Sequence, residues 1–251
     1  MLGSYETIAV DVEDGIAILT LNRPEHRNSV DDRMHSELAT IFVDIRRRKD
    51  VLAVVLTGAG EAFCAGGDSS PTRRFETFTG LTPVEEARAI VESFVDVDQP
   101  VVAAVNGDAL GLGAILATFA DAAFVARSAR IGDAHVRGGV TAGNGSSALW
   151  PLLVGLNRSK ELLLGSKILT AEEAARIGLV NEVVDDGEAL PRALELAREW
   201  AAMPVAALQT TKRAINVHLR AAVAQVLPLS LALEEQTLLP LYEAHRRNDA
   251  H

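Results

Sequence analysis

The sequence predicts an α/β fold, in which a largely parallel sheet is covered by helices and a helical region follows at the C-terminal end. Two segments, "VLAVVLTG" (51–58) and "PVVAAVNG" (100–107), are apolar throughout, which is typical of strands buried on both faces. Helical patterns separate them, and the order strand, turn, helix, strand favours parallel pairing. Hydrophobic residues make up 48% of the chain but aromatic residues only 4%, so the core must be aliphatic.

The N-terminal part predicts a hairpin followed by a helix. Residues 7–14 and 15–22 alternate in polarity, and Glu13-Asp14-Gly15 between them is a hairpin signal. Residues 29–50 predict a helix that Ser29 or Asp31 can cap. Its apolar residues recur at helical spacing: Val30, Met34, Leu38, Ile41, Phe42 and Ile45.

The middle of the chain repeats the alternation of strands and helices. A loop rich in Gly, Ser and Pro follows the strand at 51–58 and extends to about Gly80. A helix is expected from about Pro83 to Val97, before the strand at 100–107. A short apolar helix at 112–120 comes next. Extended segments at 122–128 and 129–132 follow it.

Beyond roughly Gly143 the pattern predicts helices only. Thr170, with Glu173 three residues later, is a capping signal within 169–184. The Leu-rich tail is expected to be interrupted at Pro228 and Pro240. An aliphatic tail of this length would be poorly buried on an isolated monomer, so we expect it to pack on the core or on a neighbouring subunit.

Composition and charge exclude several classes of protein. The formal net charge of −10 argues against nucleic-acid binding, which needs a basic footprint. Cys64 is the one cysteine, so a disulfide framework or a Cys-based zinc cage is excluded, and the six scattered histidines predict no metal site. The acidic start "MLGSYETIAVDVEDG" does not resemble a signal peptide, and we find no apolar run of roughly 18–20 residues for a membrane span. We therefore expect a cytoplasmic protein.

Two glycine-bearing turns each follow a predicted buried strand: "TGAGEAFCAGGDSS" (57–70) and "NGDALGLGAIL" (106–116). Turns at the carboxyl ends of parallel strands are where α/β proteins usually bind ligands. Two backbone N–H groups that converge on one oxygen form an oxyanion hole, which stabilises an enolate or a tetrahedral intermediate. The alternative is that both are ordinary tight turns. The second turn ends in Ala114, Ile115 and Leu116, which offer neither acid nor base.

Several motifs together resemble the crotonase (enoyl-CoA hydratase/isomerase) family. "AFCAGGDSS" and "PVVAAVNGDALGLGAILATFADAAFVA" are similar to that family's two glycine loops. The motifs "RPEHRNSVDDRMHSEL", "LLLGSKILTAEEAARIGLVNEVV" and "TKRAIN" match its remaining landmarks in the same order, so the resemblance covers about residues 6–218. It implies a crotonase-like spiral of ββα units in residues 1–190 and a helical trimerisation region in residues 191–251. The expected assembly is a homotrimer or a dimer of trimers.

The resemblance also implies acyl-CoA thioesters as ligands, with no cofactor beyond the coenzyme A of the substrate. The N–H groups of Ala65 and Leu112 then form the oxyanion hole; the family usually has Gly at the second position. The loops that match the CoA-holding segments are His26-Arg27 and Ala65 to Asp68. The residues expected to hold the CoA moiety are Arg27, Ala65, Gly66, Gly67, Asp68 and Leu112.

The two glutamates with which hydratases of this family add water fall on Ile115 and His135 in this sequence. Both carboxylates are absent, so ordinary two-glutamate hydration is not expected. A histidine titrates near neutral pH, and His135 is the candidate base. Its orienting partner is expected to be Asn144 or a glutamate of the tail, from the acidic pair Glu234-Glu235. Asp133 is too close in sequence for good geometry to be assumed. The alternative is a loop histidine that makes one hydrogen bond.

A second resemblance leaves the reaction open. A branch of the family that hydrolyses cyclic β-diketones has a His at the place of His135, an Asp at the place of Asn144 and a Glu near Glu234. Three hypotheses follow: an acyl-CoA enzyme with altered acid–base groups, a carbon–carbon hydrolase acting on a diketone, and a non-catalytic member that binds acyl-CoA or only assembles with partner subunits. Ile115 is the best argument for the third.

Overall fold

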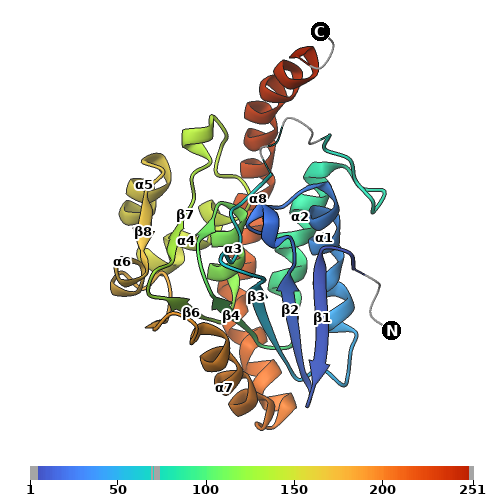
Figure 1. Ribbon diagram of the computed structural model, residues 1–251, viewed down its shortest axis with the longest axis vertical. Coiled ribbons are helices and arrows are strands. Elements are labelled where there is room, and N and C mark those ends of the chain that lie inside the picture. Colours follow the sequence, from blue (N-terminus) through green and yellow to red (C-terminus); the bar gives the residue numbers. More distant parts are fainter. Residues whose placement is uncertain (1–4, 69, 71–73, 249–251) are drawn as a thin grey trace.

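A six-stranded sheet forms the centre of the computed structural model, which describes residues 5–68, 70 and 74–248, with side chains up to residue 240 (Figure 1). The strand order is β1-β2-β3-β4-β6-β9; β1 pairs antiparallel with β2 and all other neighbours are parallel. The strands are β1 (Ile8–Glu13), β2 (Ile16–Leu21), β3 (Ala53–Gly58), β4 (Val101–Val105), β6 (Ala122–Ala126) and β9 (Glu182–Val184). A smaller sheet joins β5 (Ala109–Leu110), β7 (Arg130–Gly132) and β8 (Ile168–Thr170).

Helices follow the strands much as the periodicity predicts, so the α/β class is confirmed. They are η1 (Pro24–His26), α1 (Asp32–Arg46), α2 (Pro83–Asp96), α3 (Leu112–Phe119), η2 (Val136–Gly138), α4 (Ser146–Val154), α5 (Leu156–Leu164), α6 (Ala171–Arg176), α7 (Ala189–Ala201) and α8 (Val205–Asn248). Asp31, rather than Ser29, caps α1 by accepting a hydrogen bond from Met34 N. The predicted capping box of Thr170 and Glu173 is confirmed.

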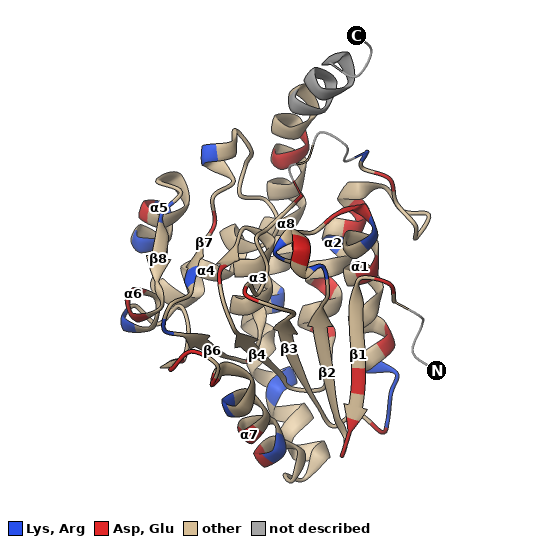
Figure 2. Cartoon of the chain, in the orientation of Figure 1, with Lys and Arg blue, Asp and Glu red and all other residues tan. Residues whose placement is uncertain are grey.

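The central strands β3, β4 and β6 are buried on both faces, and their successive side chains point alternately to one face and to the other. On one face Val54 and Val101 join the large cluster that includes α1, α2 and α3. On the other face Val55 and Val102 pack against Ala193 and the rest of α7. Figure 2 shows almost no charge on β2, β3 and β4, as strands buried on both faces require. Helix α7 packs on this sheet and is therefore part of the layered core. It overlaps the start of the helical trimerisation region predicted for residues 191–251.

Two expectations for the C-terminal half are wrong. The region beyond Gly143 is not purely helical: β8 pairs with β7 and β9 pairs with β6. Each strand has only three residues, too few to show a period-2 pattern, so the partner strand determines the conformation. Pro228 and Pro240 do not interrupt the tail either, because both lie inside the continuous helix α8. The buried Leu227 and Leu231 pack this part of α8 into the core, which offsets the hydrogen bond that a proline removes.

The N-terminal part of α8 is tied to the core of its own chain. Lys212 Nζ donates to Asp121 Oδ2 at 2.6 Å and to Gln99 O at 2.8 Å, and Arg213 pairs with Asp98. Further along, α8 contacts α4 and α2. By length and composition alone, Val205–Pro240 is long and apolar enough to cross a membrane, contrary to the expectation that no such run exists. A helix packed on the core of a soluble protein passes the same test.

Candidate active site

The two glycine turns lie side by side. Cys64 in the first turn bridges in parallel to Ala109 in the second: Cys64 N donates to Asp108 O at 3.0 Å, and Leu110 N donates to Cys64 O at 2.9 Å. Gly113 permits this approach, because a Cβ at this position would lie 2.3 Å from Cys64 O. The loop after β3 and the start of α3 therefore form one rigid unit.

Gly66 and Gly111 meet where the two turns are closest. Both have positive φ, +92° and +53°, a conformation that L side chains rarely adopt. A Cβ on Gly111 would lie 3.6 Å from Gly66 Cα and 3.7 Å from Cε1 of His135. Backbone from two turns and one imidazole ring thus converge on a single region.

The structure corrects the first predicted oxyanion donor. Ala65 N–H already donates to Arg27 O at 3.0 Å, so it is not available to a ligand. Gly66 O accepts from Val30 N at 2.8 Å, and in a trans peptide the following N–H points the opposite way. Gly67 N–H therefore points away from Val30. No hydrogen bond from this N–H to another described residue is present.

The second predicted donor has a suitable geometry. Leu112 is the first residue of α3, where the N–H groups lack an intrahelical partner. Gly111 O accepts from Ile115 N at 3.1 Å, so the Leu112 N–H in the same peptide points out of the first turn. Within the described part of the chain it has no acceptor. The Leu112 residue itself is buried.

His135 stands beside this pair of amides and is held by Asp133. One carboxylate oxygen of Asp133, Oδ1, accepts from both the backbone N–H of His135, at 3.1 Å, and the ring Nδ1. The other oxygen accepts from the hydroxyl of Ser146, at the start of α4. The Asp133 side chain is fully buried and the His135 side chain is 16% exposed. Among described residues, Nε2 of His135 makes no hydrogen bond.

The two ionisable groups shift each other's pKa in opposite directions. Burial alone raises the pKa of the Asp133 carboxyl, but the hydrogen bond and charge of His135 bring it below its ordinary value. Burial also lowers the pKa of His135. The hydrogen bond and charge of Asp133, together with the charge of Glu234, outweigh this and raise it above the ordinary histidine value. Asp133 is therefore an acceptor-only carboxylate, and Nδ1 of His135 carries a proton.

Asn144 and Glu234 lie near the site, but neither makes the hydrogen bond predicted for the orienting partner of His135. Asn144 Oδ1 is buried without a hydrogen-bond partner among the described residues. Two residues of α8 pack on Gly143, in the segment that precedes α4. Glu234 Oε2 lies 2.4 Å from where a Cβ on Gly143 would be, and Ser230 Oγ donates a hydrogen bond to Gly143 O at 2.8 Å. Glu234 thus acts on His135 through its charge, and Asp133 supplies the contact. The short side chain of Asp133 reaches the ring because His135, the residue before η2, already has helical backbone angles.

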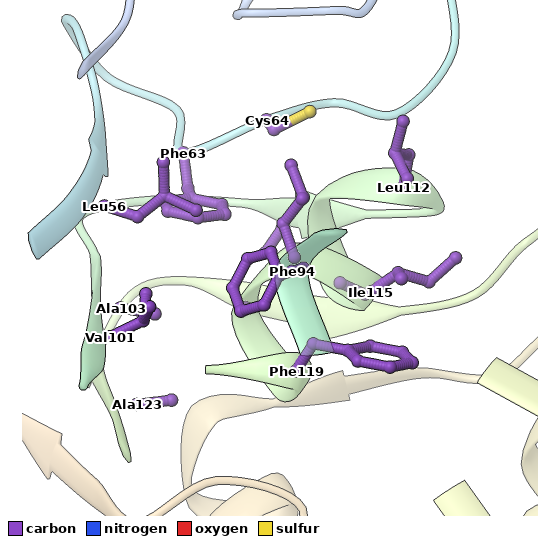
Figure 3. Close-up of a cluster of buried hydrophobic side chains, with 14 of the residues drawn as sticks. Leu56, Phe63, Cys64, Phe94, Val101, Ala103, Leu112, Ile115, Phe119 and Ala123 are labelled. Carbon is purple, nitrogen blue, oxygen red and sulfur yellow. The ribbon is translucent and has the colours of Figure 1, made fainter. Parts of the chain in front are cut away.

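Ile115, at the position of one family glutamate, lies among hydrocarbon side chains. It is 2% exposed and belongs to the cluster that contains Phe94 and Phe119 (Figure 3). Cys64 belongs to the same cluster, and burial raises the pKa of its thiol to about 12, which rules it out as a nucleophile at neutral pH. His135 and its neighbours therefore supply the titratable groups beside the amide pair.

The residues expected to hold coenzyme A come from three segments and differ in exposure: Gly67 and Arg27 are exposed, whereas Gly66 and Leu112 are buried. Arg27 has positive φ and pairs with Asp108 at 2.7 Å, while 57% of its side chain remains exposed. Asp68 accepts from Ser70 N at 2.8 Å and pairs with Arg23 at 3.4 Å. A surface hollow of about 270 Å³ adjoins Arg23 and Asp68. Among the residues described, no group of three or more His, Cys, Asp or Glu side chains is placed to hold a metal ion.

Three residues of the site were missed or undervalued by sequence reasoning: the amide of Gly67, the carboxylate of Asp133 and the hydroxyl of Ser146. A usable signal existed for Asp133, since an Asp two residues before a His at the end of a strand can reach back to the ring. For Gly67 the signal was absent, because the choice between neighbouring amides depends on which of them the distant Arg27 carbonyl uses.

Comparisons with known proteins agree on one family. The family profile described as Enoyl-CoA hydratase/isomerase matches residues 11–241. A short-chain-enoyl-CoA hydratase from Clostridium acetobutylicum is 34% identical over 210 residues, 83% of this chain and 80% of the relative. A 1,2-epoxyphenylacetyl-CoA isomerase from Escherichia coli is 37% identical over 215 residues, 84% of this chain and 82% of the relative. The crystal structure of an enoyl-CoA hydratase/isomerase from Mycobacterium paratuberculosis superposes with a TM-score of 0.87 at 36% identity, covering 92% of this chain and 93% of that one.

Proposed function

The chain belongs to the enoyl-CoA hydratase/isomerase family, and we propose that it processes acyl-CoA thioesters by proton transfer at His135. The observation that carries the proposal is the position of the His135 ring, whose Cε1 lies 3.7 Å from where a Cβ on Gly111 would be. The imidazole therefore adjoins the same short segment that presents the Leu112 amide. Both relatives described above are named for CoA esters, which supports this class of substrate.

In the proposed reaction the thioester carbonyl binds between the N–H groups of Gly67 and Leu112. Removal of a proton from the α-carbon places negative charge on this oxygen, and two preorganised donors stabilise that charge more than they stabilise the neutral ester. His135 takes the proton through Nε2, because Nδ1–H is engaged by Asp133. The reaction needs no cofactor other than the coenzyme A of the substrate.

The apolar surroundings of Ile115 favour proton transfer over ordinary hydration. Addition of water across a double bond by the two-glutamate mechanism uses one group as base and another as acid. Ile115 can do neither, and its neighbours Phe94 and Phe119 offer no substitute. A single base that removes a proton and returns it elsewhere on the same face suits enolisation and double-bond migration.

A second candidate function is hydrolysis of a β-diketone carbon–carbon bond. The His135–Asp133 pair favours it, since a histidine held by a carboxylate can activate water as well as move a proton. The amide pair would then stabilise the enolate that leaves. This candidate predicts activity on diketones without coenzyme A, whereas the first requires the thioester.

The deciding experiment follows exchange of the α-protons of a saturated acyl-CoA in D₂O by mass spectrometry. We expect the wild-type protein to catalyse exchange of the α-protons and the His135→Gln variant to lose this activity. A panel of 2-enoyl-CoAs, 3-enoyl-CoAs and cyclic β-diketones then identifies the reaction. Exchange or turnover with none of these compounds, despite binding of an acyl-CoA, would identify a non-catalytic binding protein and refute the proposal.

We also propose that the active assembly is a homotrimer or a dimer of trimers. Large hydrophobic side chains remain exposed on α4, α5 and α8 of the single chain, and contact with neighbouring subunits would remove them from water. They include Leu152, Leu156, Leu164, Ile215, Val217, Leu229, Leu233 and Leu239. Sedimentation equilibrium is expected to give three or six times the chain mass; a monomer would refute this assembly.

A further inference from the structure

We infer that Asp133 is the positioning residue of His135, and that Ser146 in turn fixes the Asp133 carboxylate. The inference rests on the proposed function and adds to it the residue that selects the tautomer of the base. The hydrogen bonds of the Asp133 carboxylate go to His135 and Ser146 and none goes to the amide pair, so its effect on the reaction passes through the imidazole.

The first observation is the way in which the Asp133 carboxylate is satisfied. Its Oδ1 accepts from the backbone N–H and from Nδ1 of His135, and its Oδ2 accepts from Ser146 Oγ. The carboxylate and the Ser146 residue are both fully buried. A buried carboxylate without donors would be costly, so this set of three donors holds the group in one orientation.

The second observation is the link between this carboxylate and the amide pair. Asp133 directly follows β7, and the preceding residue, Gly132, accepts the Gly111 N–H at 2.9 Å. The strand that positions the carboxylate therefore also positions the turn that presents the Leu112 amide. Moving Asp133 relative to this turn would require breaking the hydrogen bond that the Gly111 N–H donates to the Gly132 carbonyl.

These contacts determine which ring nitrogen is basic. An ionised carboxylate only accepts hydrogen bonds, so Nδ1 carries the proton and Nε2 bears the lone pair of the neutral ring. Nε2 is bonded to Cε1, the ring atom that adjoins Gly111. The charged groups that act on the ring are Asp133 on its own loop and Glu234 on α8. Of these, Asp133 is the one hydrogen-bonded to it.

The arrangement excludes a nucleophilic role for Ser146. In a nucleophile–base–acid triad the hydroxyl donates to the histidine, and the carboxylate lies beyond the ring. Here the hydroxyl donates to the carboxylate from the opposite side. Ser146 therefore contributes to orientation and cannot be activated by His135.

The test is ¹⁵N NMR of the histidine side chains in the full-length protein, combined with kinetics. His135→Gln identifies the His135 signal by its absence. In wild type the neutral ring is expected to be protonated at Nδ1. In Asp133→Asn, whose side-chain amide can also donate, the Nε2-protonated tautomer is expected to appear, and kcat is expected to fall by about 100-fold or more with KM little changed. Ser146→Ala is expected to give a smaller loss of kcat.

Matched variants distinguish Asp133 from the other candidates. Asn144→Ala and Glu234→Gln are expected to leave the Nδ1-protonated tautomer in place. A tautomer that is unchanged in Asp133→Asn, or that changes instead in Asn144→Ala or Glu234→Gln, would overturn the inference. Should Asp133→Asn fail to fold, Asp133→Ala removes the acceptor of Nδ1–H, and the Nε2-protonated tautomer is expected to appear in the same spectra; a ring that stays protonated at Nδ1 alone would overturn the inference. Absence of all turnover in wild type would refute the proposed function, while the NMR spectra would still decide the role of Asp133.

Discussion

The carboxylate of Asp133 accepts the Nδ1–H of His135, two residues further along the chain, and holds the ring against the turn at Gly111. This contact fixes the orientation of the ring, and under the proposed function it makes His135 the oriented base beside the two backbone donors. The side chain of Ile115 cannot transfer a proton, so under that proposal the proton moves through His135.

Replacing His135 tests whether the imidazole moves the proton. His135→Gln retains a polar side chain of similar length but cannot act as a base at neutral pH. The rate of α-proton exchange is expected to fall by about 10²–10⁴-fold, the usual contribution of general acid–base catalysis. Exchange is measured by mass spectrometry in D₂O, with His218→Gln, an exposed histidine of α8, as the control. Equal rates in the two variants would remove His135 from the mechanism.

The Leu112 amide can be deleted without removing the helix. Proline is well tolerated at the first position of a helix, where its missing N–H has no intrahelical acceptor. Leu112→Pro is therefore expected to keep α3 but to lower kcat by about 10²–10³-fold, the typical loss for one oxyanion-hole donor. Leu112→Gly keeps the N–H and serves as the matched control. A Pro variant with wild-type kcat would show that this amide does not contact the reacting oxygen.

The pH profile of the reaction reports the charges around His135. The proton acceptor is the neutral ring, so the rate is expected to rise with pH. Because Asp133 and Glu234 raise the pKa of His135, the midpoint is expected above the ordinary value of about 6.5. Glu234→Gln removes one negative charge and is expected to move the midpoint to lower pH. Glu235→Gln, on the exposed side of α8, is the control, and an equal shift in both variants would contradict the assignment.

The close approach of the two turns can be tested through Gly113. A Cβ at this position would lie 2.3 Å from Cys64 O and 2.8 Å from Cys64 Cβ, so Gly113→Ala must push the turns apart. The free energy of unfolding is expected to fall by about 1–3 kcal/mol, as measured by urea denaturation. Gly138→Ala, where a Cβ would meet nothing within 4 Å, is expected to be nearly neutral. The reverse order of stabilities would disprove the contact.

Two neighbouring cations of α8 are expected to contribute differently to stability. The Lys212 side chain is 9% exposed and donates to Asp121 and Gln99 O, so Lys212→Met is expected to cost about 1.5–3 kcal/mol. The Arg213 side chain is 49% exposed, and Arg213→Met is expected to cost less than about 1 kcal/mol. Urea denaturation measures both variants. A larger loss for Arg213 would show that the anchor of α8 lies elsewhere.

The sequence by itself determined the α/β class, most helices and strands up to Gly143, and the two turns that carry the site. These features are local: apolar periodicity sets the strands and helices, and glycines permit the positive φ of Gly66 and Gly111. The same reasoning failed for β8 and β9, which are too short to show a period and take their conformation from the strands they pair with. It also failed at Pro228 and Pro240, where packing of α8 on the core outweighs the local cost of proline.

Only the tertiary structure decided how the site is assembled. The sequence does not show whether the N–H of Ala65 or that of Gly67 is free. In the structure the Arg27 carbonyl accepts the Ala65 N–H, and the Gly67 N–H points away from Val30. Asp133, Asn144 and Glu234 are all polar residues near His135 in sequence or by resemblance, yet the turn into η2 gives the hydrogen bond to Asp133. Hydrogen bonds are directional and saturable, so which group is free and which is engaged depends on partners that distant segments bring into place.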